Sequence, residues 1–307
     1  MAMQQPPLDA QRALPLGPEG GEVGAVQSGW RLALREFMSN RLAVVGFGIL
    51  IFFVLFCFVG PYIYHTDQID TNPIIANQAP TGAHLLGTDG EGFDELGRMM
   101  KGGQAALEIG FFAAAVAIVI GALWGAVAGL AGGIVDSVMM RVVDVFLAVP
   151  FLFVVLILAV KFGATVLSLS LVIGFFAWQV PARLVRGEVL TLRERDFVLA
   201  ARTAGSGSWR LISRHLLPNA LGVVIVNVTF QVADAILAVS YVGFLGFGLH
   251  FPAVDWGDQL SNGSNFLEDG YWWQIFPVGA CIVLTVMALN FIGDALRDAM
   301  DVRLRRR

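Results

Sequence analysis

Motifs for phosphate or metal binding are lacking in this 307-residue sequence, in which only two of the 20 basic residues are lysines. A phosphate-binding P-loop requires G-x-x-x-x-G-K-[ST]. Neither Lys101, in Met-Met-Lys-Gly-Gly, nor Lys161, in Ala-Val-Lys-Phe-Gly, fits that pattern. The four histidines lie in different segments without the spacing of a metal site. We therefore expect no catalytic, metal or cofactor site in this chain.

A polar face within one apolar stretch is the strongest candidate for binding chemistry. Its members recur at positions i, i+4, i+7 and i+14: Asn227, Gln231, Asp234 and Tyr241. That spacing places all four on one side of a helix. A carboxylate at the centre of a membrane costs about 3 kcal/mol on insertion scales, so Asp234 must face protein or water. The face either lines a solute path or hydrogen-bonds neighbouring helices.

The composition indicates a membrane protein. Hydrophobic residues make up 56% of the chain and charged residues 14%, and the mean hydropathy is +0.70. Soluble domains have about 25% charged and 45–50% apolar residues, which argues against a soluble enzyme and a disordered chain. No basic stripe with interleaved aromatic residues indicates nucleic-acid binding. Cys57 and Cys281 fall in apolar runs and are expected to be buried small hydrophobes.

Six stretches approach the length of about 20 apolar residues that a spanning helix needs. They are Leu42–Gly60, Ile109–Ala131, Val145–Val160, Ala164–Val180, Ala220–Gly246 and Ile275–Ile292. Residues 161–163 join the third and fourth as a tight hairpin. The first stretch starts too far into the chain for a signal peptide. We expect a flexible tail over residues 1–40, an all-α six-span membrane domain over 41–304, and a basic C-terminus over 305–307.

The basic residues give this arrangement a direction. Cytoplasmic segments of membrane proteins are enriched in lysine and arginine. With the N-terminus inside, 17 of the 20 basic residues face the cytoplasm and three face outside. Both termini are therefore predicted to be cytoplasmic, with external loops at 65–104 and 250–271 and a large cytoplasmic loop at 181–219. That inner loop holds seven arginines and is expected to meet a partner.

The inner loop reads as a short helix–turn–helix. One predicted helical face holds mainly small residues: Phe197, Ala200, Ala201 and Ala204. Gly205 and Gly207 end that helix. Ser208 is expected to cap a second helix that starts at Trp209, and Pro218 to mark the turn into the fifth span.

This loop resembles the EAA loop of inner-membrane permeases from ABC-type importers. The matching positions are Ala200, Ala201, Gly205, Leu217 and Pro218, while Leu199 stands where the family has Glu. In that family the loop is the coupling helix, which docks into a groove of the ATPase subunit. The resemblance therefore implies that residues 195–218 couple this chain to an ATPase. The Leu199 substitution bears on a polar contact there rather than on docking itself.

Further motifs narrow the resemblance to the peptide/nickel branch of this family. They are Leu86–Asp89 with Gly92–Asp94 and Arg98, Met140–Asp144 with Pro150, Leu245–Gly248, Trp256–Gly257, and Asn290–Asp301. Phe93 and Gly97 depart from the branch's Arg and Ser, and Val302 stands where Pro is usual. The chain is similar to the C-type permease subunit of a dipeptide or oligopeptide importer. Nickel or another small solute remains open as the cargo.

The resemblance also implies the fold, the membrane location and the partner proteins of this chain. It implies the type I ABC importer permease fold in the bacterial inner membrane. The expected partners are a second homologous permease in a heterodimer, one or two ATPase subunits that carry ATP and Mg²⁺, an extracytoplasmic substrate-binding protein, and membrane lipid. Transport would proceed by alternating access, and Asp234 could then meet the amino end of a peptide.

Two other classes fit less well. A self-contained secondary transporter would need internal repeats with broken helices and paired membrane charges, and the sequence shows no repeat. A membrane-embedded enzyme would need a His/Glu zinc spacing or a Ser/Lys pair in the spans, and neither occurs. Co-purification of a stoichiometric ATPase separates these readings from the importer.

Two remaining patterns predict packing. Small residues recur at every fourth position of the second span, including Gly121, Gly125 and Gly129, which lets another helix approach closely. We expect static packing there rather than a sliding contact. Three tryptophans fall near the predicted outer interface, where such residues form aromatic belts. They are Trp256, Trp272 and Trp273.

Overall fold

The computed structural model describes residues 37–305, with side chains described through residue 300. Most of the predicted N-terminal tail and basic C-terminus lie outside this range. The described chain is helical throughout, apart from loops and one bridge between Thr88 and Asp94. The elements are α2 Arg41–Phe58, α3 Gly60–Ile63, η2 Pro73–Ile75, α4 Glu95–Ala131, α5 Gly133–Ala148, α6 Phe151–Phe162, α7 Val166–Phe175, α8 Gln179–Leu192, α9 Asp196–Thr203, α10 Ser208–Leu211, η3 Ile212–Leu216, α11 Leu217–Val242, η4 Gly243–Phe247, α12 Trp256–Ser264, η5 Trp272–Gln274 and α13 Phe276–Arg305.

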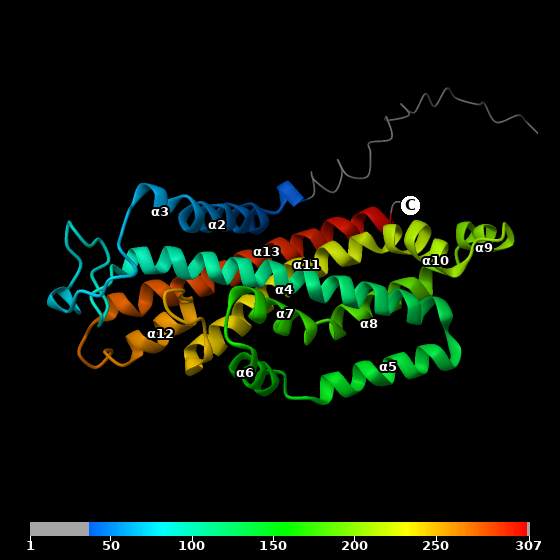
Figure 1. The fold of residues 1–307 in the computed structure, drawn as a ribbon. Coiled ribbons are helices and arrows are strands. Elements are labelled where there is room, and N and C mark those ends of the chain that lie inside the picture. Colours follow the sequence, from blue (N-terminus) through cyan, green and yellow to red (C-terminus); the bar gives the residue numbers. More distant parts are fainter. Residues whose placement is uncertain (1–36, 306–307) are drawn as a thin grey trace, which may run out of the picture.

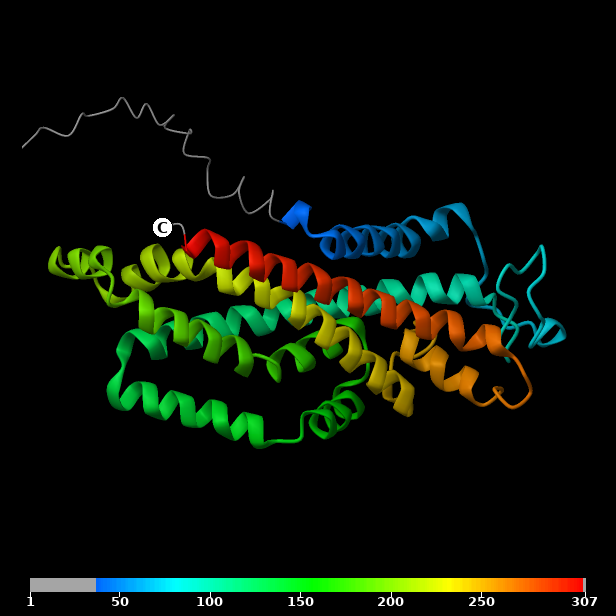
Figure 2. The ribbon, with the colours of Figure 1, turned by 180° about the vertical axis from the view of Figure 1, so that it is seen from behind.

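Three long helices, α4, α11 and α13, run along the molecule and form its centre (Figures 1 and 2). By length and composition, four segments can each cross a membrane, and two bent helix pairs raise the number to as many as six. The four are Arg41–Phe58, Glu95–Ala131, Ser208–Phe247 and Trp272–Met300. The expectation of an all-helical membrane protein is therefore confirmed.

Helix α4 begins before the apolar stretch expected as the second span. Asp94 accepts a hydrogen bond from the backbone N–H of Gly97 at 2.9 Å, which satisfies a donor that the first helical turn leaves free. Helix α4 therefore begins at Glu95, inside the segment 65–104 that we expected to be an external loop. Hydropathy missed this start because Glu95 and Arg98 are polar although the fold buries them.

The stretches expected as the third and fourth spans each form two helices that meet at a bend. Helices α5 and α6 meet at a 78° bend beside Pro150, which lacks the N–H needed to continue a helix. Helices α7 and α8 meet at a 47° bend. Helix α8 then runs to Leu192, so the first part of the expected cytoplasmic loop 181–219 is helical. The expected tight connection between the third and fourth spans is present, with Gly163 at φ 77°.

The small-residue face of α4 packs within this chain. A Cβ added at Gly125 would lie 2.3 Å from the carbonyl oxygen of Ala182, and one at Gly121 would lie 2.7 Å from that of Trp178. Gly129 likewise lies against Val189 of α8. Close approach of α4 and α8 therefore requires glycine at these positions.

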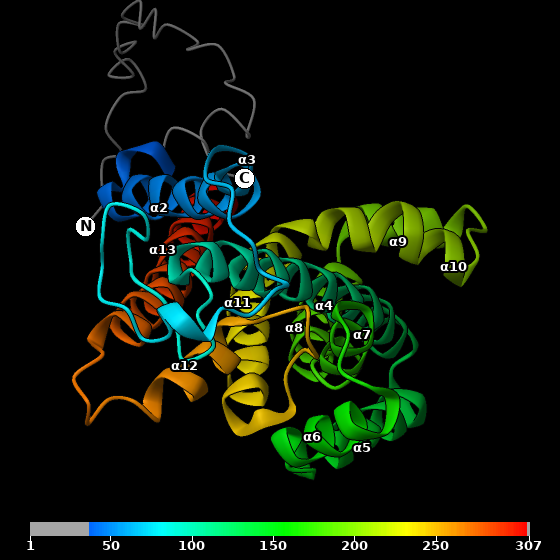
Figure 3. The ribbon, with the colours of Figure 1, turned by 60° about the vertical axis from the view of Figure 1, so that its left-hand side comes forward.

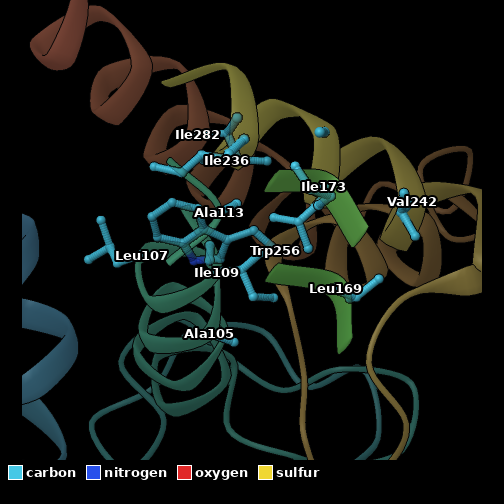
Figure 4. Packing of buried hydrophobic residues seen from close by; sticks show 14 of the residues in the cluster. Ala105, Leu107, Ile109, Ala113, Leu169, Ile173, Ile236, Val242, Trp256 and Ile282 are labelled. Carbon is cyan, nitrogen blue, oxygen red and sulfur yellow. The ribbon is translucent and has the colours of Figure 1, made fainter. Parts of the chain in front are cut away.

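Trp256, which we expected in an aromatic belt at the outer membrane interface, lies in the core. Figure 4 shows Trp256 among buried residues of α4, including Leu107 and Ile109. Trp256 is 0% exposed, and its indole N–H donates to the carbonyl of Met99 at 3.0 Å. Trp273 is also buried. The belt prediction is wrong for both, because their indole N–H groups find protein carbonyls and need no interface.

Candidate functional site

The inner helix pair, residues 196–211 in α9 and α10, projects from one end of the bundle (Figure 3). Gly205, at φ 79°, ends α9 in a Schellman motif. The Ser206 N–H donates to the carbonyl of Ala201 at 3.0 Å, and the Gly205 N–H donates to that of Arg202 at 2.9 Å. Glycine adopts this left-handed conformation at no steric cost. The turn therefore fixes how α10 leaves α9.

The inner helix pair sits on a small hydrophobic cluster. Val198 is the one fully buried side chain of α9 among the described residues. It packs with residues from α8, α10 and η3, and the buried members are Ala126, Val185, Val189, Val198, Leu211, Ile212 and Leu216. This cluster anchors the pair to the bundle while leaving most of its surface free.

The direction of Val198 defines which face of α9 points away from the protein. At 100° per residue, Ala200 lies on the side opposite Val198, and Phe197 and Leu199 flank that outward face. Phe197 is 42% and Leu199 44% exposed, and Ala200 is exposed. Ala201 is half-buried. The structure thus presents a smooth, small-residue ridge between two apolar side chains.

The junction with α11 differs from the expectation in two respects. Ser208 is the first residue of α10, and Gly207 is the capping residue, without a side-chain hydrogen bond. Pro218 marks no turn, because one long helical segment runs from Ser208 to Phe247. The π-helical turn η3 lies directly before α11, and the Leu217 N–H donates to the carbonyl of Ile212. Pro218 then sits in the first turn of α11, where a missing N–H is tolerated.

Arginines surround this surface without internal partners. Arg202, Arg210 and Arg214 are exposed, and none forms an ion pair with another described residue. Unpaired cations around an apolar ridge favour a partner with an acidic rim, because complementary potentials speed and orient association.

Three arginines of the expected cytoplasmic loop lie in or directly after α8 and bind other groups of this chain. Arg186 holds Asp136 of α5 with two hydrogen bonds at 2.5 and 2.7 Å. Arg183 contacts Asp144 at 2.5 Å, and Arg193 donates to a carbonyl at the end of α4. The sequence carried a signal for these pairs, since both the arginines and the aspartates recur at helical spacing. They tie α5 to α8 near the inner helix pair.

A cavity of about 250 Å³ lies between the two broken spans and α11. Most of its wall is apolar and aromatic, with three polar side chains, Gln179, Gln231 and Asp234. Val149 and Phe151 flank the bend at Pro150, while Phe176, Ala177 and Gln179 line the second bend. Both helix breaks therefore border the same space.

The structure separates the polar face predicted on the fifth span. Gln231 and Asp234 line the cavity. Asn227 is buried one turn away against α4 and α8, and its Oδ1 has no hydrogen-bond partner among the described residues. Tyr241 is 54% exposed and lies outside the cavity wall. Gln179, from a different helix, completes the polar set, and no sequence spacing could have linked it to α11.

The outer cap, residues 64–98 together with 249–274, occupies the opposite end of α4 (Figure 1). Asp94 accepts hydrogen bonds from the Tyr64 hydroxyl at 2.8 Å and contacts Nδ1 of His84 at 2.9 Å. Asp89 pairs with Arg98 at 3.2 Å. Burial raises the pKa of the Asp89 carboxyl, and the Arg98 charge opposes that rise. The motif at 86–98 thus builds a closed polar network.

The all-helical fold, its bent spans and its projecting inner helix pair define a transport permease. The family model described as "Binding-protein-dependent transport system inner membrane component" matches residues 117–306, and a model for the N-terminal TM domain of oligopeptide transport permease C matches residues 28–80. The chain belongs to this permease family. It is a multi-pass inner-membrane component of a bacterial transport system, which implies a binding protein and an ATPase as partners.

Individual relatives align along nearly the whole chain. The Escherichia coli oligopeptide transport system permease protein OppC is 40% identical over 274 residues, which cover 89% of this chain and 90% of the relative. The Bacillus subtilis dipeptide transport system permease protein DppC is 36% identical over 274 residues, covering 89% and 86%. The Haemophilus influenzae OppC is 38% identical over 274 residues, covering 89% and 88%.

Proposed function

We propose that this chain is the C-type permease subunit of an ATP-driven importer of dipeptides or oligopeptides. Relatives named for both cargoes align over about 90% of the chain, and this extent of similarity carries the proposal. The finer arrangement that we propose has six spans in the type I permease fold, with the two bent pairs as the third and fourth spans. Both termini are cytoplasmic, as the distribution of basic residues favours.

Energy enters from outside the chain. Reversing a two-state equilibrium from 1:99 to 99:1 takes about 5.5 kcal/mol, and we assign its source to ATP and Mg²⁺ bound on partner ATPase subunits. A second permease, in a heterodimer, would complete the translocation path. The binding protein would deliver cargo at the outer cap. Transport then proceeds by alternating access, with no catalytic step in this chain.

The inner helix pair is the proposed point of coupling. The supporting observation is its geometry: the ridge around Ala200 faces away from the protein, while Val198 anchors it to a buried cluster. A movement of an ATPase groove around this ridge would reach α8 and α11 directly through that cluster. Residues 195–218 therefore form the proposed coupling segment.

The cargo is tested by uptake in cells that lack this chain. Labelled dipeptide, labelled oligopeptide and nickel are each offered to the deletion strain with and without the restored chain. Peptide uptake that returns with the chain supports the proposal. Restored nickel uptake without peptide uptake would identify the alternative cargo and contradict the peptide assignment.

The coupling assignment is tested by Ala200→Arg on the outward ridge of α9. A long charged side chain there should prevent docking and lower ATPase co-purification at least tenfold, while the protein still inserts. Ala253→Arg is the matched control, because Ala253 is an exposed alanine in the outer cap. An Ala200→Arg variant that retains its ATPase as well as the control does would disprove the assignment.

A further inference from the structure

We infer that Asp234 binds the α-ammonium group at the amino end of a peptide that enters the cavity between the two broken spans. This inference rests on the proposed peptide import and adds the chemical group that the permease itself recognises. It assigns a binding site to this chain in addition to any selection made by the binding protein.

The first support is the isolation of the Asp234 carboxylate. It makes no hydrogen bond or ion pair with another described residue. None of the described residues that line the cavity carries a positive charge. A carboxylate in the membrane interior is stable when it faces water or a cation. Asp234 therefore supplies a negative site that the chain leaves open for a ligand.

The second support comes from the two glutamines beside it. Gln179 is 5% and Gln231 is 6% exposed, and neither carboxamide is hydrogen-bonded to another described residue. The polar atoms of both carboxamides are not among the fully enclosed unpartnered atoms, so they can bind water or a ligand in the cavity. Each carboxamide offers one acceptor and two donors, which suits the C=O and N–H groups of a peptide backbone. An α-ammonium group followed by a peptide group would therefore meet matching partners in Asp234 and the two glutamines.

The size of the cavity restricts what it can hold. Its volume of about 250 Å³ is below the roughly 300–1,000 Å³ of typical small-molecule pockets. The space suits the end of a peptide rather than an entire oligopeptide. Aromatic and aliphatic walls, including Phe146, Phe151 and Ile173, can receive a first side chain with little chemical preference. The site would thus recognise the amino terminus of a peptide and accept many different first side chains.

The position of the cavity offers a way to release the ligand. Residues on both sides of the 78° and 47° bends form its wall. Binding sites of transporters are typically built where membrane helices are discontinuous. A change in either bend would move Phe151 or Phe176 relative to Asp234, so the conformational cycle can open the site to each side in turn.

Binding is tested on the purified importer through a cysteine at the cavity wall. Val180 lines the cavity and is exposed, while Cys57 and Cys281 are buried, so Val180→Cys supplies the accessible thiol. Labelling by an uncharged maleimide is measured against alanylalanine amide, a cation, and against its N-acetylated counterpart, which is neutral. The cationic probe should slow labelling and the acetylated probe should not.

Substitutions at Asp234 identify the group responsible. Adding Asp234→Asn should raise the half-protecting concentration of the cationic probe at least about tenfold, as expected for a lost hydrogen bond to a charged group. Asp234→Glu should keep protection within about threefold. Asp269→Asn is the control, because it removes a charge of the same kind from an exposed external segment.

Three results would overturn the inference: no protection by the cationic probe, equal protection by the two probes, or protection unchanged in Asp234→Asn. Loss of the second permease from the purified Asp234→Asn complex would also overturn it, by identifying a subunit cation as the partner. The labelling assay measures binding without transport, so its result is independent of the cargo-uptake experiment. A protected thiol with no peptide uptake would refute the proposed function alone.

Discussion

The outer cap and the inner helix pair differ in whether their polar and aromatic side chains are buried and paired. In the outer cap, Asp94 and Arg98 are buried and paired, and Trp256 donates to a core carbonyl. In the inner helix pair, the arginines are exposed and unpaired within the described chain, and α9 buries one side chain fully. The outer cap pairs its charged groups within the chain, although Oε1 of Gln68 and of Gln259 has no hydrogen-bond partner among the described residues. The inner helix pair leaves its arginines for a partner.

This difference separates residues that hold the fold from residues that await another molecule. Buried polar groups need hydrogen-bond partners, and the outer cap supplies them to Asp94 and Arg98 from its own chain. The polar groups of the cavity, Gln179, Gln231 and Asp234, resemble those of the inner helix pair, because they too have no partner among the described residues. Asn227 and Gln259 also hold a buried oxygen without a partner among the described residues. An unpaired group therefore marks a region proposed to act only where it also borders an open cavity or an exposed surface.

The largest effect that would test this contrast is expected for Trp256→Ala. Removing a fully buried tryptophan from the core costs about 3–5 kcal/mol of unfolding free energy, because a cavity forms and the Met99 carbonyl loses its donor. Thermal inactivation of the detergent-purified protein measures the loss. Trp272→Ala is the matched control, since Trp272 is 51% exposed, and it should change stability by less than about 1 kcal/mol.

Similar losses for the two tryptophan variants would contradict the distinction between a buried and an exposed tryptophan of the outer cap. Trp256→Phe is expected to lose less stability than Trp256→Ala. It keeps one aromatic ring near Phe53, whose ring centroid lies 6.0 Å from that of Trp256, and removes the indole N–H together with the second ring.

A smaller effect, directed at transport, is expected at Gly205. The position has open space around an added Cβ, so the constraint is its φ of 79° rather than crowding. A non-glycine residue costs about 1–2 kcal/mol in this conformation. Gly205→Val should therefore lower ATP-driven uptake the most, Gly205→Ala less, and Gly205→Asn least, because Asn tolerates the left-handed region. Uptake at equal membrane abundance measures the order.

Gly187 provides the matched control for this series. It lies inside α8 with open space around an added Cβ and no positive φ. Gly187→Ala should leave uptake unchanged and favour the helix slightly. A Gly205→Val variant with normal uptake would show that the turn does not transmit coupling.

Sequence reasoning located the apolar stretches well where hydrophobicity alone decides the structure. The first span, expected over 42–60, is α2 at Arg41–Phe58, where Asn40 caps the first turn through the N–H groups of Leu42 and Ala43. Cys57 and Cys281 are buried as expected. The glycine spacing of α4 correctly indicated a close helix contact, although it could not name α8 as the neighbour.

What the sequence could not predict depends on tertiary pairing, which hydropathy does not report. The burial of Glu95 and Arg98, and the ion pair of Arg98 with Asp89, depend on how the segment before α4 folds. The ion pairs of Arg183 with Asp144 and of Arg186 with Asp136 join residues 39 and 50 positions apart. The cavity needs Gln179 beside Gln231, and only the folded arrangement of α8 and α11 brings them together.

The smallest expected effect concerns Leu199, where the related permeases carry Glu. Leu199 is 44% exposed beside the outward ridge, so replacing it should leave stability within about 0.5 kcal/mol. If it contacts an apolar part of the ATPase groove, Leu199→Glu forfeits about half of a full leucine burial, roughly 1 kcal/mol, and ATPase retention falls about fivefold. Leu199→Met keeps the apolar contact and should retain the ATPase fully. A gain in ATPase retention by Leu199→Glu would instead show that the partner keeps a cation for the family's glutamate. The inner helix pair would then be defined by charge rather than by its apolar ridge.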